Sequence, residues 1–427
     1  MDKRQTIVVA GGGFAGLNFV KHIDKKRFRV ILVDRNNYHS FPPLFYQIAS
    51  SGLTPDSICF PYRRELRKGK GRGAEFHLGE IRSVNLARRT VTTQFETINY
   101  DYIVIAAGST NNFFGNDSLR DTVYTLKSTA QAMRCRDEIL DRLERASLCH
   151  DPDERKRMLS FTVVGGGPAG VEIAGALGEM KRYILHRSYP SIPLDDVSIT
   201  LIEGSDRLLG AMSEKSQRDA LKYVGELLVE VRLGTVVKSY DGDEITLSDG
   251  SRRHCGMLIW TAGIKGVDLN LSPAVESGKG SRLIVDEYNR LTGFESSAFA
   301  LGDIALMQCP DYPAGHPQLA QVAIQQGVTL ASNLNRGTFT RKFVYRDKGT
   351  MATVGRNRAV ADIGPSHLSG WIAWIAWMFI HLISLLGMRN KVNVLIDWMW
   401  GYFNYSTSLR LLLYPSRYPL KWRWGEN

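Results

Sequence analysis

Two glycine-rich loops, each between an apolar run and a segment with helical spacing, constrain the fold of this chain most strongly. The first loop is GGGFAG at residues 11–16, which follows the run TIVVA. The second is GGGPAG at residues 165–170, which follows the run FTVV. A strand, a GxGxxG loop and a helix begin a dinucleotide-binding βαβ unit, because backbone N–H groups at the helix start can meet a pyrophosphate. The sequence therefore predicts two bound dinucleotides.

An acidic residue closes the next apolar run after each loop. Asp34 lies 18 residues after Gly16 (34−16), close to the spacing of about 20 that places a carboxylate on a ribose. Glu203 lies 33 residues after Gly170 (203−170), because residues 183–196 read as an insertion between helix and strand. The longer spacing departs from the usual pattern. For both acids, an ordinary carboxylate at a strand end is the alternative interpretation.

The carboxylate of Glu203 favours NAD over NADP as the second dinucleotide. A carboxylate accepts hydrogen bonds from ribose hydroxyls and repels a 2′-phosphate. Asp206 adds a second negative charge nearby, whereas Arg207 is the residue that would reverse this preference.

A second pair of glycines indicates that the two loops belong to two copies of one domain plan. Both follow an apolar run, YIVIAAG and MLIWTAG. Gly108 lies 92 residues after Gly16 (108−16), and Gly263 lies 93 residues after Gly170 (263−170). Such a repeat is not expected of two accidental glycine loops. We therefore predict an α/β fold with two Rossmann-like dinucleotide-binding domains.

Cysteine content and charge narrow the classes of function further. The five cysteines include no CxxC or CxxxxC pair, which argues against a disulfide framework, a zinc ribbon or a local redox dithiol, and we predict no metal site. Only the distant Cys149 and Cys309 keep sulfide oxidation open as an alternative. The formal charge of +11 calls for an acidic partner, such as nucleic acid, anionic lipid or a phosphate-bearing ligand. The first residues contain no apolar stretch of signal-peptide length, so we do not expect secretion.

The character of the chain changes near residue 342. Residues 343–345 and 350–354 read as strands separated by a turn at 346–349. Residues 366–388 then form a run of 23 without Asp, Glu, Lys or Arg, long enough to reach the roughly 20 needed to span a bilayer. Histidine, serine and glycine within this run argue against a simple spanning helix.

The end of the chain is aromatic and basic. Seven of the eight tryptophans lie there, at positions 371, 374, 377, 398, 400, 422 and 424. From Ser366 onward six Lys/Arg and two acids give a net charge of +4, so the remaining +7 is distributed over 365 residues. Aromatic side chains at headgroup depth with cations facing anionic lipid are typical of an interfacial anchor. We expect a monotopic anchor; a spanning helix, a homodimer contact and a core hairpin are the alternatives.

Several stretches make the chain resemble the two-dinucleotide flavoprotein reductases. These are AAGS at 106–109, WTAGI at 260–264 and FALGDIA at 299–305. Within that superfamily, NYHSFPPLFYQIASSGL, GGGPAGVEIAGAL, HPQLAQVAIQQG and DKGTMATVGRNRAVADIG resemble the type II NADH:quinone oxidoreductases. The matching stretches are scattered between residues 7 and 363, so the resemblance covers most of the chain.

The resemblance implies FAD in the first unit and NADH, as co-substrate, in the second. It implies a discontinuous FAD-binding domain at 1–120 and 283–340, an NADH-binding domain at 121–282 and a membrane-associating region at 341–427. The residues implied to bind FAD are Gly11, Gly13, Phe14, Ala15, Gly16, Asp34, Ala107, Gly108 and Asp303. Those implied to bind NADH are Gly165, Gly167, Gly170, Glu203 and Gly263.

Two positions of this pattern carry specific expectations. The resemblance places Asp303 at the ribityl–phosphate region of the flavin, where its carboxylate would accept from ribityl hydroxyls and amides of a following helix would meet the phosphate; a helix N-cap is the plainer interpretation. The family pattern GVE places Glu172 near the nicotinamide and flavin rings, with a role in positioning or proton handling. The alternative for Glu172 is an acid that complements the dipole of its helix start.

Gln321 and Gln325 are the candidates for contact with the quinone. The sequence predicts a helix over residues 320–326, on which the two glutamines lie at i and i+4 and so share one face. A neutral amide can hydrogen-bond a quinone carbonyl without adding charge. In the resembling family this segment passes the flavin on its quinone side. Buried glutamines that only pack the helix are the alternative.

These observations predict FAD-dependent oxidation of NADH with two-electron reduction of a membrane quinone. No sequence feature indicates a proton channel, so we expect no proton pumping. We expect a peripheral location on the cytoplasmic face of the membrane, with a quinone and an anionic lipid surface as partners and no nucleic acid. Alternatives are a sulfide:quinone reductase, a reductase of a soluble electron carrier, and a nucleic-acid-binding redox flavoprotein of the apoptosis-factor type.

Overall fold

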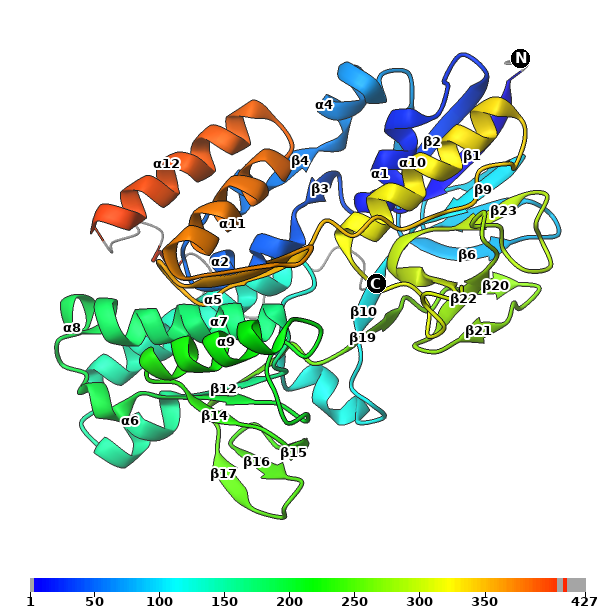
Figure 1. Cartoon of the computed structure of the whole chain (residues 1–427). Helices are drawn as coiled ribbons and strands as arrows, with labels where there is room; N and C mark the ends of the chain where they lie inside the picture. Colours follow the sequence, from blue (N-terminus) through cyan, green and yellow to red (C-terminus); the bar gives the residue numbers. More distant parts are fainter. Residues whose placement is uncertain (1–3, 405–409, 413–427) are drawn as a thin grey trace. The chain divides into compact units, whose positions relative to one another are not determined.

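The computed structural model describes residues 4–404 and 410–412, which form two compact units (Figure 1). Unit 1 is built from the described parts of residues 1–40, 60–110 and 264–348. Unit 2 is built from the described parts of 41–59, 111–263 and 349–427. The predicted Trp422 and Trp424, with the cations Arg417, Lys421 and Arg423, lie outside the described residues.

A five-stranded parallel sheet forms the centre of unit 1. Its order is β23-β9-β1-β2-β5, and its strands are β1 (Gln5–Ala10), β2 (Phe28–Asp34), β5 (Glu75–Leu78), β9 (Tyr102–Ile105) and β23 (Ala298–Ala300). The apolar runs read from the sequence are β1, β2, β9 and β23, and they are nearly continuous in apolar character because both faces of the sheet are covered. The edge strand β5 carries Glu75 and His77 and was not predicted.

Helices and a small mixed sheet cover the two faces of this central sheet. Helices α1 (Phe14–His22) and α10 (Ala320–Arg336) pack closely together, since a Cβ on Gly327 would lie 2.5 Å from the Ala15 carbonyl oxygen (Figure 1). On the other face, Val84, Val91 and Ile98 of the small sheet join the core cluster of the central sheet. The small sheet consists of β6 (Ile81–Asn85), β7 (Thr90–Thr93), β8 (Thr97–Asn99) and β20 (Leu271–Ser272).

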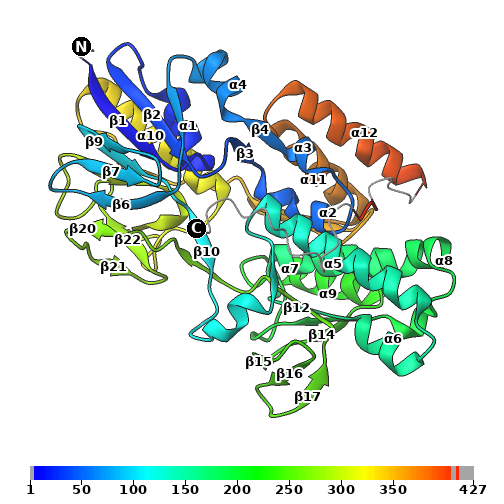
Figure 2. The same cartoon turned by 180° about the vertical axis from the view of Figure 1, so that it is seen from behind.

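Unit 2 repeats this plan, as the sequence predicts. Its parallel sheet has the order β11-β18-β12-β13-β14, with β11 (Tyr124–Thr125), β12 (Ser160–Val164), β13 (Ser198–Ile202), β14 (Glu230–Arg232) and β18 (Met257–Trp260). Figures 1 and 2 show helices α7 (Pro168–Glu179) and α9 (Glu214–Glu226) on one side of this sheet and β15 (Val237–Tyr240), β16 (Glu244–Leu247) and β17 (Arg252–His254) on the other. The α/β fold with two Rossmann-like domains is therefore confirmed.

The insertion predicted in unit 2 follows helix α7 directly. It contains a single π-helical segment (Met180–Ile184), α8 (Leu185–Ser188) and a 3-10 turn (Leu194–Asp196). These elements add chain between α7 and β13 without changing the order of the sheet.

The chain after α10 differs from the sequence prediction in two respects. The expected strand at 343–345 is absent: the N–H of Phe343 donates to Glu287 O within unit 1, and the partner of β25 (Thr350–Thr353) is β26 (Ala359–Ile363). The uncharged run 366–388 is not one segment. It divides into β27 (Ser366–Ser369), α11 (Gly370–Ser384) and the start of α12 (Met388–Asn404).

Helix α11 lies on the three-stranded sheet β25-β26-β27. Its buried residues are Ala373 and Trp377, and Ala373 packs against Ala359 and Ala361 of β26. Trp371, the first tryptophan of α11, is instead 61% exposed. None of the helices in the described ranges is sufficiently long and apolar to cross a membrane.

The remaining elements are distributed over both units. Unit 1 also contains α4 (Tyr62–Arg67), β21 (Ser277–Gly278), β22 (Arg282–Val285), β24 (Ala305–Met307) and the 3-10 turns η2 (Gly69–Gly71) and η6 (Gly302–Ile304). Unit 2 also contains α2 (Phe45–Ala49), α3 (Pro55–Ile58), α5 (Thr129–Leu148), α6 (Pro152–Met158) and the 3-10 turns η1 (Pro42–Leu44) and η3 (Asp117–Asp121). Strands β3 (Tyr38–Ser40), β4 (Cys59–Pro61), β10 (Ser109–Asn111) and β19 (Ile264–Gly266) lie where the chain passes from one unit to the other.

Candidate functional site

The glycines of the first loop have three different physical roles. Gly11 has φ +109°, and a Cβ there would overlap the carbonyl oxygen of Ala106, so only glycine fits this turn. A Cβ on Gly16 would overlap the carbonyl oxygen of Gly11, so the last glycine lets α1 begin against the loop. A Cβ on Gly13 would meet no atom within 4 Å. The helix start is therefore open at Gly13, where a phosphate can approach the backbone.

The second loop has the same geometry in unit 2. Gly165 has φ +110°, and its Cβ would lie 2.7 Å from the Ala262 nitrogen. A Cβ on Gly170 would overlap the carbonyl oxygen of Gly165, whereas a Cβ on Gly167 would meet no atom within 4 Å. Each unit thus carries a helix start that is open at one glycine.

The two acids hold their loops through matching hydrogen bonds. Asp34 Oδ2 accepts from the N–H of Gly12 at 2.7 Å, and Glu203 Oε2 accepts from the N–H of Gly166 at 2.5 Å. The second carboxylate oxygen of each accepts from the N–H two residues further on, at 2.8 Å in the first unit and 2.7 Å in the second. Glu203 therefore occupies the position of Asp34 despite its longer spacing, because the insertion lies outside the sheet.

Asp206 and Arg207 form an exposed ion pair beside the second loop. Arg207 Nε lies 2.7 Å from Asp206 Oδ1. The cation that would have favoured a 2′-phosphate is therefore neutralised by its neighbour, which leaves Glu203 as the acid at the loop.

Two residues at the first loop were not predicted from the sequence. The hydroxyl of Tyr62 donates to Gly12 O at 2.8 Å and lies 3.4 Å from Asp34 Oδ2. His39 Nδ1 lies 3.0 Å from Gly12 O, and burial lowers the pKa of His39 to about 4, so the neutral ring donates this bond. Phe14 packs edge-on to His39, with ring centroids 5.4 Å apart. His39 belongs to the stretch NYHSFPP, which was the one available signal.

Asp303 lies in unit 1 but does not precede a helix. A single 3-10 turn leads directly into strand β24, so both the predicted N-cap and the predicted helix of phosphate-binding amides are wrong. The hydroxyl of Ser109 donates to Asp303 Oδ2 at 2.6 Å, which places the acid beside the end of β9. The buried amide of Gln326 holds the turn, since Gln326 Oε1 accepts from Gly302 N at 2.7 Å.

Gly108 follows β9 in unit 1, Gly263 follows β18 in unit 2, and both have a left-handed backbone. Gly108 has φ +74°, follows Ala107, and has no atom within 4 Å of an added Cβ. Gly263 has φ +70°, but the Phe114 ring would lie 2.5 Å from its Cβ. Unit 1 is therefore open at this strand end, whereas unit 2 is covered there by an aromatic ring.

Gln321 and Gln325 lie on one face of α10, as predicted, and both amides already bind the chain that follows. Gln321 Oε1 accepts from Lys348 N at 3.1 Å. Gln325 accepts from Arg346 N at 3.0 Å and donates to Arg346 O at 2.9 Å. These bonds explain why residues 346–348 follow α10 without forming the expected strand and turn.

Glu172 is buried within unit 2, on the first turns of α7. Its side chain is only 7% exposed, and burial raises the pKa of its carboxyl group well above the ordinary value of 4.5. The N–H of Thr353 on β25 donates to this carboxyl group and moderates the rise. The indole N–H of Trp377 lies near the same group and also lowers the pKa, although its geometry falls short of a hydrogen bond.

Aromatic side chains from α2 and α11 lie beside this carboxyl group. Trp377 is 1% exposed and stacks on His381, with ring centroids 4.1 Å apart, and it lies 6.4 Å from the ring of Tyr46. Burial raises the pKa of the Tyr46 hydroxyl, and the nearby Glu172 raises it further. Burial lowers the pKa of His381 to about 4, so its ring is neutral. The site thus places among aromatic rings an acid whose burial favours the protonated form.

Comparison with protein families divides the chain in two. Residues 5–327 match the pyridine nucleotide-disulphide oxidoreductase family, and residues 348–404 match the NDH2 C-terminal domain family. The second match begins just before β25 and ends with α12.

Curated relatives match over most of the chain. A type II NADH:quinone oxidoreductase of Mycobacterium tuberculosis is 33% identical over 93% of this chain and 88% of its own. An external alternative NADH-ubiquinone oxidoreductase of Yarrowia lipolytica is 29% identical over 93% of this chain and 79% of its own.

Two solved structures share the fold. NDH2 from Plasmodium falciparum, solved in complex with NADH, has a TM-score of 0.88 at 22% identity and covers 96% of this chain and 100% of its own. The sulfide:quinone oxidoreductase of Aquifex aeolicus has a TM-score of 0.71 at 18% identity over 94% of this chain and 96% of its own. The repeated dinucleotide loops, the family matches and the 33% identity together place this chain in the pyridine nucleotide-disulphide oxidoreductase family and, within it, among the type II NADH:quinone oxidoreductases.

Proposed function

We propose that this protein oxidises NADH and reduces a quinone by two electrons, with FAD as the resident carrier and without pumping protons. One observation carries the proposal: the same open glycine loop, closed by the same pair of carboxylate hydrogen bonds, occurs in both units of a chain from this family. One loop serves the cofactor and the other serves the co-substrate.

The residues of unit 1 fit the adenosine and pyrophosphate portions of FAD. The open backbone at Gly13 suits a pyrophosphate, and Asp34 offers a carboxylate to a ribose hydroxyl. The open space at Gly108, beside Asp303, suits the part of the cofactor that continues past the end of β9. Bound FAD supplies the ability to take a hydride from NADH and to pass two electrons onward.

In unit 2 the same arguments assign NADH to the loop at 165–170. Gly167 is open to a pyrophosphate, and Glu203 offers a carboxylate that favours a free 2′-hydroxyl over a 2′-phosphate. The pairing of Arg207 with Asp206 supports NADH over NADPH.

Glu172 is proposed to act beside the quinone as a proton-holding group. Its burial keeps a proton on the carboxyl group at pH values where an exposed glutamate is ionised. Tyr46 and Trp377 give it an apolar, aromatic environment in which a quinone ring can pack. A neutral acid in such a place can donate a hydrogen bond to a carbonyl.

Gln321 and Gln325 are proposed as further quinone contacts, on the resemblance given above. Their amides bind residues 346–348 in this structure, so contact with a carbonyl requires an amide to exchange one of these bonds. We therefore propose that the two amides also position residues 346–348, which lie between α10 and β25 in the sequence.

Membrane association is proposed through one face of α11 and α12. The buried faces pack on unit 2 through Ala373, Trp377, Asn390 and Val394, whereas the other faces expose large apolar side chains. Such an exposed apolar set on a soluble surface marks an interaction site. The exposed residues are Trp371, Ile372, Ile375, Phe379, Ile380, Ile383, Met388, Val392, Leu395, Ile396, Met399, Trp400, Tyr402 and Phe403.

We propose a lipid bilayer as the occupant of this face, with the protein on the cytoplasmic side of the membrane. Tryptophan and tyrosine among aliphatic side chains suit the headgroup region. The alternative is a homodimer through the same face. Its molecular mass would rise from that of one chain to that of two as the protein concentration increases, and lipid would dissociate it.

The proposed reaction is tested by steady-state assay of the full-length protein with a short-chain quinone. We expect NADH consumption that depends on the quinone and equals its reduction, with NADPH a much poorer donor. Quinone-independent NADH oxidation, or none, would contradict the proposal.

A further inference from the structure

Helix α4 and the turn after it concentrate positive charge in unit 1. Residues 62–73 contain six Lys/Arg and one acid, a net charge of +5 within 12 residues. The charge outside the C-terminal region is therefore not evenly distributed, contrary to the sequence analysis. The six cations are Arg63, Arg64, Arg67, Lys68, Lys70 and Arg72, and we call them the basic surface.

The charges of the basic surface are available to a ligand. All six side chains belong to exposed residues, and none forms an ion pair with an acid in the part of the chain that the structure describes. The acid of the segment, Glu65, is paired with Lys21 at 3.0 Å. Lys25 extends the positive region, because its Nζ donates to Lys70 O at 2.7 Å.

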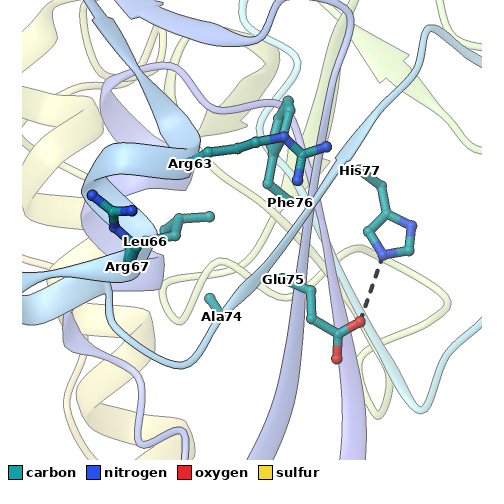
Figure 3. Close-up of a pocket in the computed structure, with 7 residues that line it drawn as sticks. All are labelled: Arg63, Leu66, Arg67, Ala74, Glu75, Phe76 and His77. Carbon is teal, nitrogen blue, oxygen red and sulfur yellow. Dashed lines mark ion pairs between the residues drawn. The ribbon is translucent and has the colours of Figure 1, made fainter.

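An open pocket lies within the basic surface (Figure 3). The guanidinium of Arg63 lies 5.2 Å from the centroid of the Phe76 ring, which fixes its position at one wall. Glu75, at the opposite wall, is already compensated: Arg29 binds both of its oxygens at 2.8 Å, and His77 lies 3.5 Å from one of them. The pocket is lined by Arg63, Leu66, Arg67, Ala74, Glu75, Phe76 and His77.

The cations of the C-terminal helices do not supply this charge among the described residues. Lys391 is used internally, because its Nζ donates to Ile383 O at 2.7 Å at the end of α11. Arg410 donates to Ser188 Oγ at 2.6 Å. Of these three cations, Arg389 is the one whose residue is exposed. A cationic surface elsewhere on the chain would add an electrostatic contact to the apolar one.

Chain connectivity favours lipid as the partner of the basic surface. Within unit 2, Asn390 of α12 donates from Nδ2 to Cys59 O at 2.9 Å, so Cys59 is fixed to the membrane-facing helix. Four residues of chain separate Cys59 from Arg63 (63−59), and a chain of that length extends at most about 14 Å. The chain therefore limits the distance between Cys59, which α12 binds, and the first cation of the basic surface.

We propose that the basic surface binds the phosphate headgroups of anionic lipids, with the pocket between Arg63 and Arg67 receiving one headgroup. This inference rests on the membrane association proposed above and adds a second, electrostatic contact to the apolar one. Each exposed cation near an anionic bilayer contributes to binding, and the effect falls as salt rises.

Vesicle sedimentation of the full-length protein tests the inference. The variant R63Q/R67Q/K68Q/K70Q is compared with K156Q/R157Q/K238Q/K279Q, which removes four exposed cations elsewhere and has the same net charge. Vesicles are phosphatidylcholine alone or phosphatidylcholine mixed with phosphatidylglycerol. We expect the first variant to partition about 10- to 100-fold more weakly than the native chain onto anionic vesicles only. The control variant should retain native partitioning.

Equal loss in both variants, or no loss in the first, would overturn the inference. A first variant that loses binding to duplex DNA but not to anionic vesicles would overturn it in favour of a nucleic acid partner. Failure of the proposed function is seen separately, as loss of native partitioning onto neutral vesicles or of NADH oxidation with a short-chain quinone. Both of these should be unchanged in the first variant.

Discussion

Replacing Glu203 by glutamine tests the nucleotide preference at a single residue. The amide keeps one acceptor for Gly166 N–H but sets its NH2 group against the N–H of Ser205, and it removes the charge that repels a 2′-phosphate. A hydrogen bond to a charged group contributes about 1.5–3 kcal/mol, so we expect the KM for NADH to rise about 10-fold or more. The preference for NADH over NADPH should fall.

The matched control for this prediction is D34N in the other unit. Asp34 makes the same two bonds to the first loop, so D34N should lower the flavin content of the purified protein and leave the KM for NADH of the flavin-loaded fraction unchanged. An E203Q variant that loses flavin but keeps its nucleotide preference would show that the two loops have been assigned in the wrong order.

Burial of Glu172 predicts a pH-dependent effect of the substitution E172Q on stability. The unfolded chain releases this proton near pH 4.5, whereas the folded chain retains it because burial raises the pKa. Native stability therefore falls as pH rises above 4.5, by at most about 1.4 kcal/mol per pH unit, until the folded pKa is reached. The E172Q variant has no carboxyl group at this position, so its stability lacks this decrease with rising pH.

Thermal unfolding measured across pH checks this prediction. The Tm of E172Q minus that of the native chain should increase with pH from about pH 5 upward. E214Q, at an exposed position on α9, changes the net charge equally and separates the local effect from a general one. A Tm difference that is constant with pH would show that Glu172 is ionised in the folded chain.

The sequence predicted the residues that lie within the loops and missed those that reach them from a distance. Asp34, Glu203 and the glycines follow from local spacing, because strand, loop and helix are consecutive in a βαβ unit. Tyr62 and His39 bind Gly12 from 50 and 27 residues away, and nothing in their local pattern indicates this. Only the tertiary fold brings them to the loop.

Two alanine substitutions in the first glycine loop are expected to have different effects, one on the stability of the fold and the other on FAD binding. G16A places a Cβ against the Gly11 carbonyl oxygen at the start of α1, so it should destabilise the fold by several kcal/mol. G13A meets open space, so it should fold as the native chain does and weaken FAD binding instead. Tm and flavin content of the two variants distinguish these outcomes; equal loss of Tm would contradict the assignment of Gly13 to the cofactor.

Short elements were predicted less well than long ones. The run 343–345 has strand-like residues, but the N–H of Phe343 donates to Glu287 O, and the amides of Gln321 and Gln325 on α10 bind the chain after this run. After Asp303 an apolar run reads equally as helix or strand, and pairing of β24 with β22 decides for a strand. The run 366–388 contains no charged residue that would mark a boundary, and pairing of β27 with β26 reveals where α11 begins.

At the scale of the whole molecule, the exposed face of α11 and α12 should determine membrane retention. The variant F379Q/W400Q changes two exposed side chains, at 62% exposure each, without touching the packing of Trp377 or Val394. We expect it to move from the membrane to the soluble fraction while NADH oxidation with a short-chain quinone persists.

Truncation after Asp362 is a less selective form of the same test. It would remove β27, which pairs with β26, and Trp377, which lies beside Glu172, so it should release the chain from the membrane and also abolish quinone reduction. Tight membrane retention of the truncated chain, or of F379Q/W400Q, would contradict the proposed anchor.

The repetition of one domain plan is the feature of the whole molecule that the sequence predicted best. The two sheets have equivalent strand orders, and their glycines and acids correspond. The central claim is that one unit holds a flavin and the other presents NADH to it. Anaerobic mixing of the purified protein with NADH, then with a short-chain quinone, tests this most directly. The account predicts that NADH bleaches the flavin absorbance, that the quinone restores it, and that NADPH bleaches it far more slowly; a flavin that NADH fails to bleach would contradict it.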